Sequence, residues 1–587
     1  MQLGLNWYLR RKLRLTGFKF ELREAPVTMV SSTNGWGGRI PNHLFAASTY
    51  MNGVTLTGKP GERHTSIDKD DLFMTLDDNK RTRSHIVRNG FIICTGWTTY
   101  PRFAPSIQEI RLVNHYFRTT AAMPFASERA AQFTLEAFKV RHPEYQDEVR
   151  VTSKDNDTLF FIELIHVSPT TQAMFNALRE VREYLGTGMS AREAMCHTQR
   201  HKITKRKNWE HSLPESDLEE LSGELDQTYR EQFAQMLRCE EVVSEDDIFA
   251  RANATAALVD VIESLKHAMG TDSLSIATSG VPYSDTPITM EMVAGTKPTN
   301  TRSQQIQDVI ASAEGTDVIF IELGDNPKME VTDLVELNAW AAQLGKPILV
   351  DVSSVGTGNV DFDKLFGLHM VVGAIASTTK YSSGTVMGGV FIRNSLCAWK
   401  DLDTFTEKLK SIGQSMMFWA DTAVHVRDLP TYDERLRGHS HNAEQAAQLL
   451  SLLPGVKVNY PTENGSAEFI RPFLREDAGF GGMLSVQFDQ AFYSEQQIVD
   501  IVNALDEFMV TSLSFGLPFN TALAYPATVF PGQPESECGL DVLTVRISLG
   551  PNKEEGYRAV EAVSSAIAKV MGQEFLRGSE NQLHALV

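Results

Sequence analysis

The segment PILVDVSSVGTGNVDFDKLFGLHMVVGAIASTTKYSSGTVMGG, residues 347–389, decides the fold of this chain. It holds two apolar runs rich in β-branched residues, at 347–354 and 370–378. Short runs of this kind, separated by helical stretches, are typical of strands in a buried parallel sheet. The segment therefore predicts two neighbouring strands of an α/β domain, joined by a right-handed connection.

The same alternation continues upstream of this segment. Two more strands and three helices are expected there, at 273–278, 318–323, 257–269, 303–313 and 332–344. Gly345 follows the last of these helices as a natural C-cap. The pattern therefore extends the parallel sheet back to about residue 250.

The C-terminal part mixes strands and helices. Helical patterns at 441–453, 495–508 and 553–571 accompany strand-like runs at 482–489 and 544–550. This mixture predicts a second, smaller α/β domain at the end of the chain.

The first 250 residues have less regular patterns. Residues 105–145 are expected to be helical and amphipathic. A strand is expected at 158–165, and a helix that opens near Ser212 by a capping box with Glu215. Residues 1–90 show poor periodicity and are expected to form short strands and loops.

These patterns predict an α/β chain in four parts. Residues 1–95 form an N-terminal extension, and 96–245 form an arm with an insert. Residues 246–415 form the large domain with a mostly parallel sheet, and 416–587 form the small domain.

Length and composition exclude several classes of protein. The chain has 587 residues, of which 42% are hydrophobic, so it can bury a large core and is neither a small module nor a disordered protein. A formal net charge of −19 argues against a nucleic-acid binder, and the basic cluster at 199–207 is expected to be a solvated surface.

Cysteines and hydropathy bear on the compartment. Five scattered cysteines without metal-ligand spacing indicate free thiols in a reducing compartment and no metal site. No stretch has the apolar length that a membrane span needs, so we expect a cytoplasmic protein.

Chemistry-bearing residues follow the predicted strands, where open α/β sheets bind their ligands. Asp351 ends one strand, and Ser377, Thr379 and Lys380 follow the next. Taken singly, the carboxylate could be a helix cap and the lysine a solvated loop residue. Together, a carboxylate, an amine and two hydroxyls match the ring nitrogen, aldehyde and phosphate of pyridoxal phosphate (PLP).

These residues resemble the cofactor-binding core of the Cys/Met metabolism PLP enzymes, the cystathionine γ-synthase family. That family has an Asp, then S-x-T-K-Y, a Gly-rich turn and a G-G pair. The insert around 145–245 and the GFGG stretch at 479–482 make the chain most similar to the long fungal members. Four further segments resemble the family: ELGDNPKMEV (322–331), VPYSDTPITM (281–290), TVRISLGPNKEE (544–555) and TTYPRF (98–103).

The resemblance implies a role for each matched residue around the cofactor. Lys380 would bond the aldehyde and then move protons, and Asp351 would pair with the ring nitrogen. Ser377 and Thr379 would hold the phosphate, and Tyr283 would stack on the ring.

The remaining matched residues would complete the site. Tyr100 and Arg102 would reach the phosphate of a neighbouring subunit, and Asn326 would bond the ring hydroxyl. Arg546 would clamp the substrate carboxylate, with help from Ser514. Each has a plainer alternative, such as a turn residue, a core aromatic or a surface ion pair.

The resemblance also implies a fold, a reaction and partners. The fold would be the aspartate-aminotransferase-like (type I) PLP fold. The reaction would be a γ-replacement of trans-sulfuration and methionine biosynthesis, in which an O-acylhomoserine and cysteine give cystathionine. Close variants are an O-acetylhomoserine sulfhydrylase, a C–S lyase and an enzyme of specialised metabolism. The implied partners are amino-acid substrates and further copies in a homodimer or homotetramer, without nucleic acid or membrane.

One departure from the family concerns the phosphate. The family opens its phosphate-binding helix with Ser-Gly-Met, whereas this chain has RANAT at 251–255 and lacks that glycine. Either Arg251 supplies charge to the phosphate, or the pocket is altered. An altered pocket motivates a further hypothesis, a non-catalytic homologue acting as a partner subunit. The retention of Lys380, Asp351 and Arg546 argues against it.

Overall fold

The computed structural model describes most of the chain from residue 122 onward. The described residues are 84–88, 91–96, 122–125, 127–154, 159–164, 171–190, 193–194, 215–239, 241–382, 386–413, 415–505, 507–511, 515–518, 520–525 and 544–576. The basic cluster at 199–207 lies outside them. Within them, β1 (Ser84–Arg88) and β2 (Phe91–Gly96) form an antiparallel pair.

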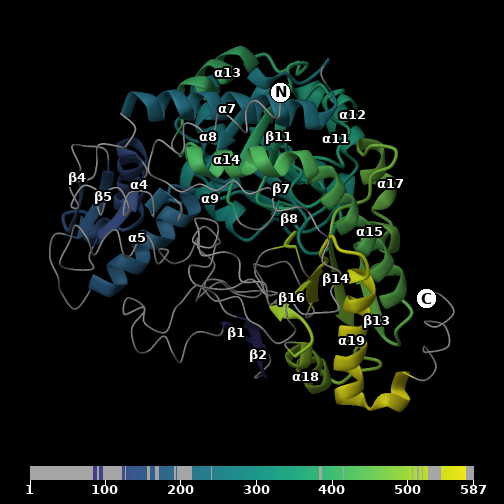
Figure 1. Ribbon diagram of the computed structural model, residues 1–587. Helices are drawn as coiled ribbons and strands as arrows, with labels where there is room; N and C mark the ends of the chain where they lie inside the picture. The colour runs from purple at the N-terminus through teal and green to yellow at the C-terminus, as the bar shows by residue number, and fades with distance from the viewer. Residues whose placement is uncertain are drawn as a thin grey trace.

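A seven-stranded sheet forms the centre of the molecule (Figure 1). Its order is β6-β12-β11-β10-β9-β7-β8. The strands are β6 (Ile248–Arg251), β7 (Ile276–Ser279), β8 (Thr299–Thr301), β9 (Val318–Glu322), β10 (Ile348–Asp351), β11 (Val371–Ala376) and β12 (Gly389–Arg393). The strands from β7 to β11 are parallel, and β12 is antiparallel to both neighbours. The predicted, mostly parallel sheet is confirmed.

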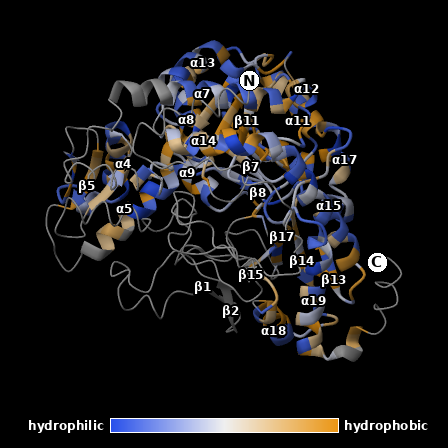
Figure 2. Ribbon diagram, viewed as in Figure 1, coloured by the Kyte–Doolittle hydropathy of each residue, from blue (hydrophilic) through white to orange (hydrophobic). Residues whose placement is uncertain are grey.

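The apolar runs explain why this sheet is central. All residues of β9 and β11 are buried. Figure 2 shows hydrophobic residues around β7 and β11. Because helices cover both faces of such a sheet, its strands carry continuous apolar runs instead of an alternating pattern.

Helices connect and cover these strands. They are α8 (Ala254–Met269), α9 (Asp285–Ala294), α10 (Ile306–Ala313), α11 (Leu334–Leu344), α12 (Phe362–Phe366), α13 (Leu402–Ser411) and α14 (Trp419–Asp428). The Asp333 side chain caps α11 by accepting from the amides of Val335 and Glu336. Gly345 ends α11 with a φ of 66°, as its C-cap position predicts.

A five-stranded sheet lies in the C-terminal part, in the order β13-β14-β17-β16-β15. It consists of β13 (Val456–Asn459), β14 (Met483–Phe488), β15 (Val510–Thr511), β16 (Thr521–Tyr525) and β17 (Thr544–Ser548). The accompanying helices are α15 (Tyr432–Leu450), α16 (Pro461–Asn464), α17 (Ala467–Ile470), α18 (Glu495–Leu505) and α19 (Glu555–Met571). The predicted mixture of strands and helices is confirmed.

An inserted module, residues 122–190, lies to one side of the large sheet (left in Figure 1). Its order is β3 (Ala122–Phe125), α4 (Glu128–Arg141), β4 (Val149–Lys154), β5 (Leu159–Leu164) and α5 (Thr171–Leu185). β5 lies between β3 and β4 and is antiparallel to both. Gly188, after α5, adds an antiparallel bridge to Phe125. This is the split βαβ arrangement of ferredoxin-like modules.

Of the helix expected at 105–145, residues 105–121 lie outside the described residues, and the described remainder is helical only in part. α4 lies inside that range, but residues 122–125 form β3 instead of helix. Pro124 opposes a helix interior, and pairing with β5 buries all four residues of β3. The helix therefore begins only after Ser127, whose side chain accepts from the Ala130 amide.

The helix expected after Ser212 is α7 (Glu215–Leu237), although Ser212 itself lies outside the described residues. Its apolar stripe is buried at Leu225, Tyr229, Phe233 and Leu237. The stripe faces α14 and the edge of the large sheet, with which α7 is in contact. The periodicity therefore predicted the buried side of α7 correctly.

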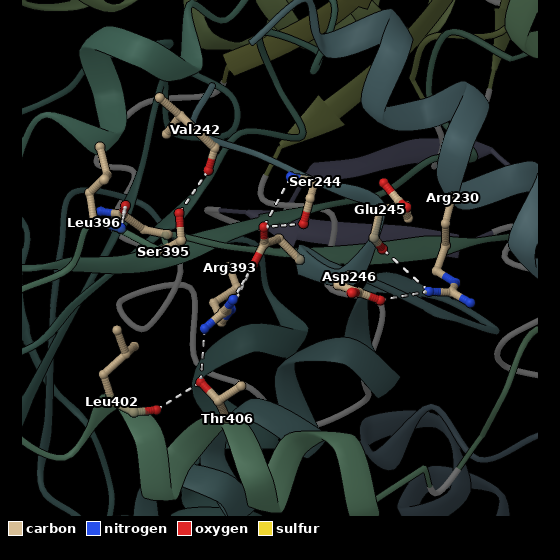
Figure 3. A network of polar contacts seen from close by, with 12 residues as sticks. Arg230, Val242, Ser244, Glu245, Asp246, Arg393, Ser395, Leu396, Leu402 and Thr406 are labelled. Carbon is tan, nitrogen blue, oxygen red and sulfur yellow. Dashed lines mark hydrogen bonds and ion pairs between the residues drawn. The ribbon is translucent and has the colours of Figure 1, made fainter. Parts of the chain in front are cut away.

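A polar network anchors the connection between α7 and β6 (Figure 3). The buried Asp247 carboxylate accepts hydrogen bonds from Arg393 on β12 and from the Ser244 amide and hydroxyl. Arg230 on α7 lies 3.8 Å from the carboxylate of Asp246. The network holds α7 against the edge of the sheet.

Cys239 and Cys397 are buried free thiols. Burial raises the pKa of Cys239 to about 12 and that of Cys397 to about 11, which disfavours their thiolate forms. Separately, within the described part of the chain, no helix has both the length and the apolar character of a membrane span.

Candidate active site

Two carboxylates lie side by side at the carboxyl ends of β9 and β10. Glu322 and Asp351 are paired residues of these neighbouring parallel strands. Glu322 is buried and accepts a hydrogen bond of 2.7 Å from the Tyr283 amide. Asp351, which is half-buried, accepts one of 2.7 Å from the Ser353 amide.

Both carboxyl groups have a raised pKa. Burial, and then the charge of Asp351, raise the pKa of Glu322 well above its usual value. Burial also raises the pKa of Asp351, although the Ser353 hydroxyl and amide and the positive charge of Lys380 oppose the shift. When one of the two carboxyl groups is ionised, ionisation of the other is therefore disfavoured. A cation near Asp351 would offset the negative charge.

The predicted lysine lies in the loop after β11. Lys380 is buried, with 8% of its surface exposed. The Ser377 amide donates to Ser353 Oγ at 2.8 Å, which ties this loop to the end of β10. Thr379 Oγ1 accepts from the Gly388 amide at 3.0 Å and donates to the Gly388 carbonyl at 3.3 Å. The loop is therefore fixed on both sides of the lysine.

The residue after the lysine braces the two sheets. Tyr381 has a φ of 60°, a conformation that costs free energy for a non-glycine residue. Its amide donates to the Gly516 carbonyl at 3.0 Å. Its hydroxyl donates to the Ser354 carbonyl at 2.5 Å and accepts from the Gly482 amide at 3.1 Å. Tyr381 thus joins the end of β10 to the start of β14.

An arginine from the C-terminal sheet completes the group. Arg546, on β17, is 1% exposed and donates to Asn326 Oδ1 at 3.4 Å. Phe515 lies close to both cations, with its ring centroid 4.2 Å from Lys380 Nζ and 5.6 Å from Arg546 Cζ. The aromatic face is a favourable neighbour for both positive charges.

At the start of α8, the contacts of Arg251 differ from the expectation that this residue binds a phosphate. The buried guanidinium of Arg251 forms an ion pair with Asp260 on α8 and donates to the Ala250 and Ile412 carbonyls. The side chain of Asn253 caps α8 by accepting from the Ala256 amide at 2.9 Å. Arg251 therefore supports the fold. The structure does not favour the first explanation of the RANAT departure, in which Arg251 supplies charge to the phosphate.

Three predicted site residues, Tyr100, Arg102 and Ser514, lie outside the described residues. Of the others, Lys380, Asp351, Ser377 and Thr379 lie at adjacent strand ends, where the sequence predicted them. The remaining three reach the same place by other contacts: Tyr283 through Glu322, and Asn326 and Arg546 through their own hydrogen bond.

The sequence of this region matches a known family model. The model of the Cys/Met metabolism PLP-dependent enzymes matches residues 246–555, more than half of the chain. The chain belongs to the Cys/Met metabolism PLP-dependent enzyme family. This match confirms the predicted family, its fold and its cofactor.

Curated relatives of this family member are identical to it at about a quarter of the aligned positions. A cystathionine γ-synthase-like protein, ankD, from Aspergillus thermomutatus is 27% identical over 48% of this chain and 50% of its own length. Methionine γ-lyase from Arabidopsis thaliana is 27% identical over 41% of this chain and 54% of its own length. The chain thus spans about half the length of these relatives. The Aspergillus protein confirms the predicted similarity to fungal members.

Among solved structures, metB from Corynebacterium glutamicum superposes on this PLP-dependent family member with a TM-score of 0.46 and 20% identity. The superposition covers 56% of this chain and 83% of that chain.

The side chains present fit the cofactor of the family. Among the described residues, the buried Oγ of Ser377 has no hydrogen-bond partner, and a phosphate oxygen would supply one. Asp351 offers a carboxylate whose charge a protonated ring nitrogen would offset. Lys380 adds the amine, from the same loop as Ser377. These three groups match the three attachment points of PLP.

Two residues of this site were missed in the sequence. Glu322 follows the apolar run VIFI just as Asp351 follows ILV, so its place at a strand end was a usable signal. Phe515 had a weaker signal, because only its position next to Ser514 linked it to the site. Its contact with Lys380 depends on how the two sheets meet, which no local pattern encodes.

Proposed function

We propose that this protein catalyses a γ-replacement on an O-acylhomoserine, with cysteine as the nucleophile and cystathionine as the product. The observation that carries the proposal is the pair of buried side chains Lys380 and Arg546 beside Phe515, with the carboxylate of Asp351 close enough to Lys380 for their charges to interact. Together they combine an amine, a carboxylate and a guanidinium where strands from both sheets converge. An amino-acid substrate needs all three when its chemistry depends on PLP.

Arg546 is the proposed substrate anchor. A guanidinium binds a carboxylate through two parallel hydrogen bonds, and burial at 1% exposure removes the competing water. Asn326, which accepts from Arg546, fixes its orientation. In the proposal, Ser514 adds a hydroxyl to the same carboxylate. The α-carboxylate would thereby be held at a fixed distance from Lys380.

Lys380 is the proposed proton carrier. When bound, PLP supplies an electron sink that stabilises negative charge on substrate carbon atoms. A γ-replacement also needs protons removed from and returned to neighbouring carbons of the substrate. The amine of Lys380 lies in a loop fixed on both sides, and little of it meets solvent. It is therefore suited to move protons within the substrate instead of exchanging them with water.

The other predicted residues are proposed to hold the cofactor. Asp351 would keep the ring nitrogen protonated, and Ser377 and Thr379 would bind the phosphate. Tyr283 would lie against the ring. Its amide already bonds Glu322, which places its backbone at the end of β9. Tyr100 and Arg102 are proposed to reach the phosphate of a second subunit, so that the working unit is a homodimer or a larger homo-oligomer.

Reactions with other nucleophiles share the same machinery. The relatives include a methionine γ-lyase and cystathionine β-lyases, so a C–S lyase is the second candidate function. An O-acetylhomoserine sulfhydrylase and an enzyme of specialised metabolism use the same groups with other nucleophiles. A non-catalytic homologue would keep the fold and lose the chemistry.

The deciding experiment is the visible absorption spectrum of the purified protein beside Lys380→Ala. A cofactor band that is absent from the variant and shifts with O-acetylhomoserine would support cofactor, lysine and substrate class together. Product analysis with cysteine, with sulfide and without nucleophile then separates synthase, sulfhydrylase and lyase. A protein that stays colourless with added PLP would overturn the proposal in favour of the non-catalytic homologue.

A further inference from the structure

The inserted module contacts the large domain at the start of α8. The turn after α5 brings Gly186 next to Asn253, the N-cap residue of α8. Asn253 Nδ2 donates to the Gly186 carbonyl at 3.0 Å, while Asn253 Oδ1 accepts from the Ala256 amide at 2.9 Å. One side chain therefore holds both the module and the first turn of the helix.

Glycine is the only residue type that fits position 186 without strain. The φ of Gly186 is 63°, in the left-handed region that favours glycine. A Cβ atom there would lie 2.4 Å from Asn253 Oδ1 and 2.6 Å from the Ala256 nitrogen. Both distances are far below contact distance, and one of the two atoms is backbone. A side chain at 186 would therefore displace the start of α8.

The start of α8 is linked to the lysine loop by contacts through Gly388 and Gly389. A Cβ atom on Gly389 would lie 2.2 Å from the Ala254 nitrogen, so β12 and the first residue of α8 are in close contact. The neighbouring Gly388 forms two hydrogen bonds with Thr379, next to Lys380. A shift of α8 at its first turn would therefore reach the loop that carries Lys380.

Two more contacts fix the position of the module. The Thr289 hydroxyl on α9 donates to the Tyr184 carbonyl at 2.7 Å. The Ser190 hydroxyl donates to Asp421 on α14 at 2.6 Å. α9 begins two residues after Tyr283, so the module also contacts the helix that follows this residue. Residues 184–190 thus form hydrogen bonds with side chains of Thr289 on α9, Asp421 on α14 and the N-cap of α8.

We propose that the inserted module is a structural part of the cofactor site, because its turn at Gly186 fixes the start of α8 beside the loop that carries Lys380. Gly186 and Asn253 act as positioning residues, because their hydrogen bonds hold the amides of the first helical turn in place. The inference rests on the cofactor of the proposed function and is independent of its substrate.

The test compares Gly186→Ala with Gly270→Ala. Gly270 ends the same helix with nearly the same φ, 64°, and a Cβ atom there would meet no other atom within 4 Å, so this variant carries the backbone strain alone. Apoprotein of the full chain is titrated with PLP, and the dissociation constant is measured by absorbance. Gly186→Ala is expected to raise the constant about tenfold or more, and Gly270→Ala to leave it unchanged.

A second variant avoids the steric clash. Asn253→Ser keeps a good N-cap but loses the hydrogen bond to the Gly186 carbonyl. It is expected to raise the PLP dissociation constant in the same direction, and to speed amide hydrogen exchange in the first turn of α8 in the apoprotein. Exchange at this turn is a readout that needs no enzyme activity.

The outcomes separate this inference from the proposed function. Equal PLP affinity in Gly186→Ala, Gly270→Ala and wild type, with unchanged exchange in the first turn of α8, would overturn the inference while the proposed function stands. A wild-type protein that binds no PLP would overturn the proposed function. In that case, unchanged exchange in Asn253→Ser would also overturn the inference, and faster exchange would support the positioning part of it.

Discussion

At the scale of single residues, the pairing of Glu322 with Asp351 is a source of pH dependence. Both carboxyl groups have a raised pKa in the folded protein, chiefly through burial. A raised pKa means that the folded state binds protons more tightly than the unfolded state does. The contribution of each group to stability is therefore complete below its unfolded pKa, about 4, and is lost as the pH rises through the folded pKa.

Glu322→Gln is expected to remove much of this loss. The amide keeps an oxygen for the Tyr283 N–H but carries no charge beside Asp351. The apoprotein variant should unfold at a higher temperature than wild type at pH 8, and the difference should shrink toward pH 4. Thermal melts over this pH range measure it. Glu336→Gln, at an exposed position on α11, is the matched control for the loss of one carboxylate. A pH-independent difference for Glu322→Gln would contradict the explanation.

The ion pair between Arg251 and Asp260 gives a second residue-scale prediction. Both side chains are buried, at 3% and 1% exposure. Asp260→Asn leaves an unpaired buried guanidinium and should lower the free energy of unfolding by about 3–5 kcal/mol. Urea denaturation measures the change, with the exposed Asp272→Asn as control. A small loss of stability with a large loss of PLP affinity would instead assign Arg251 to the phosphate.

The predictability of single residues follows from where they lie in the chain. Lys380, Ser377 and Asp351 follow apolar strands directly, so the strand pattern fixed their positions in the sheet. The partners of Arg251 could not be predicted. Two of its acceptors, the Asp260 carboxylate and the Ile412 carbonyl, reach it only through the tertiary packing of α8 and of the end of α13. In the sequence, the charge of Arg251 suggested only a phosphate contact or an altered pocket.

At the scale of elements, the loop of Tyr381 links the two sheets. Tyr381→Phe keeps the ring but leaves the Ser354 carbonyl and Gly482 amide without their partner. It should slow the covalent attachment of PLP to Lys380, measured by borohydride trapping, and destabilise the protein by about 1–3 kcal/mol.

Tyr460→Phe is the matched control for this prediction. Tyr460 is also buried, and its hydroxyl donates to the Gly481 carbonyl at 3.2 Å in the same turn. Its loss should cost comparable stability without changing the rate of PLP attachment. The bracing role would be wrong if both variants slowed attachment equally.

Elements were predictable where one face or both faces are apolar. The strands β9, β10 and β11 and the helix α11 with its Gly345 cap follow directly from such runs. β3 was harder to predict, since four residues directly before a helix are too few to show a strand period. Pro124 argues against a helix interior there, and the pairing with β5, about forty residues later, selects the strand.

At the scale of the whole molecule, the proposed contribution of Tyr100 and Arg102 to a second subunit is testable by complementation. Lys380→Ala and Arg102→Ala each damage a different component of a shared site. Mixed dimers would contain one intact site, so random reassembly should restore about a quarter of the wild-type sites. Steady-state activity of the mixture, against each variant alone, measures the recovery. A mixture no more active than the single variants would mean that each chain builds its own site.

The four-part division of the chain also stays a prediction at this scale. The two sheets, at 248–393 and 456–548, lie on either side of the predicted boundary near residue 415. The ferredoxin-like arrangement of residues 122–190 could not be predicted, because its strands are short and its fourth strand is a single bridge. Topology of this kind depends on pairing between distant residues and leaves little local periodicity.

The place of the module in the chain has a consequence for biosynthesis. The Gly186 carbonyl and the Asn253 side chain that binds it are 67 residues apart. At roughly 5–20 residues per second, a ribosome needs several seconds to make that stretch, which is ample time for a small unit to fold. The strands and helices of the module are therefore synthesised several seconds before Asn253. Because α5 packs against α8 and α9, the module gains its full set of contacts only when these helices have followed.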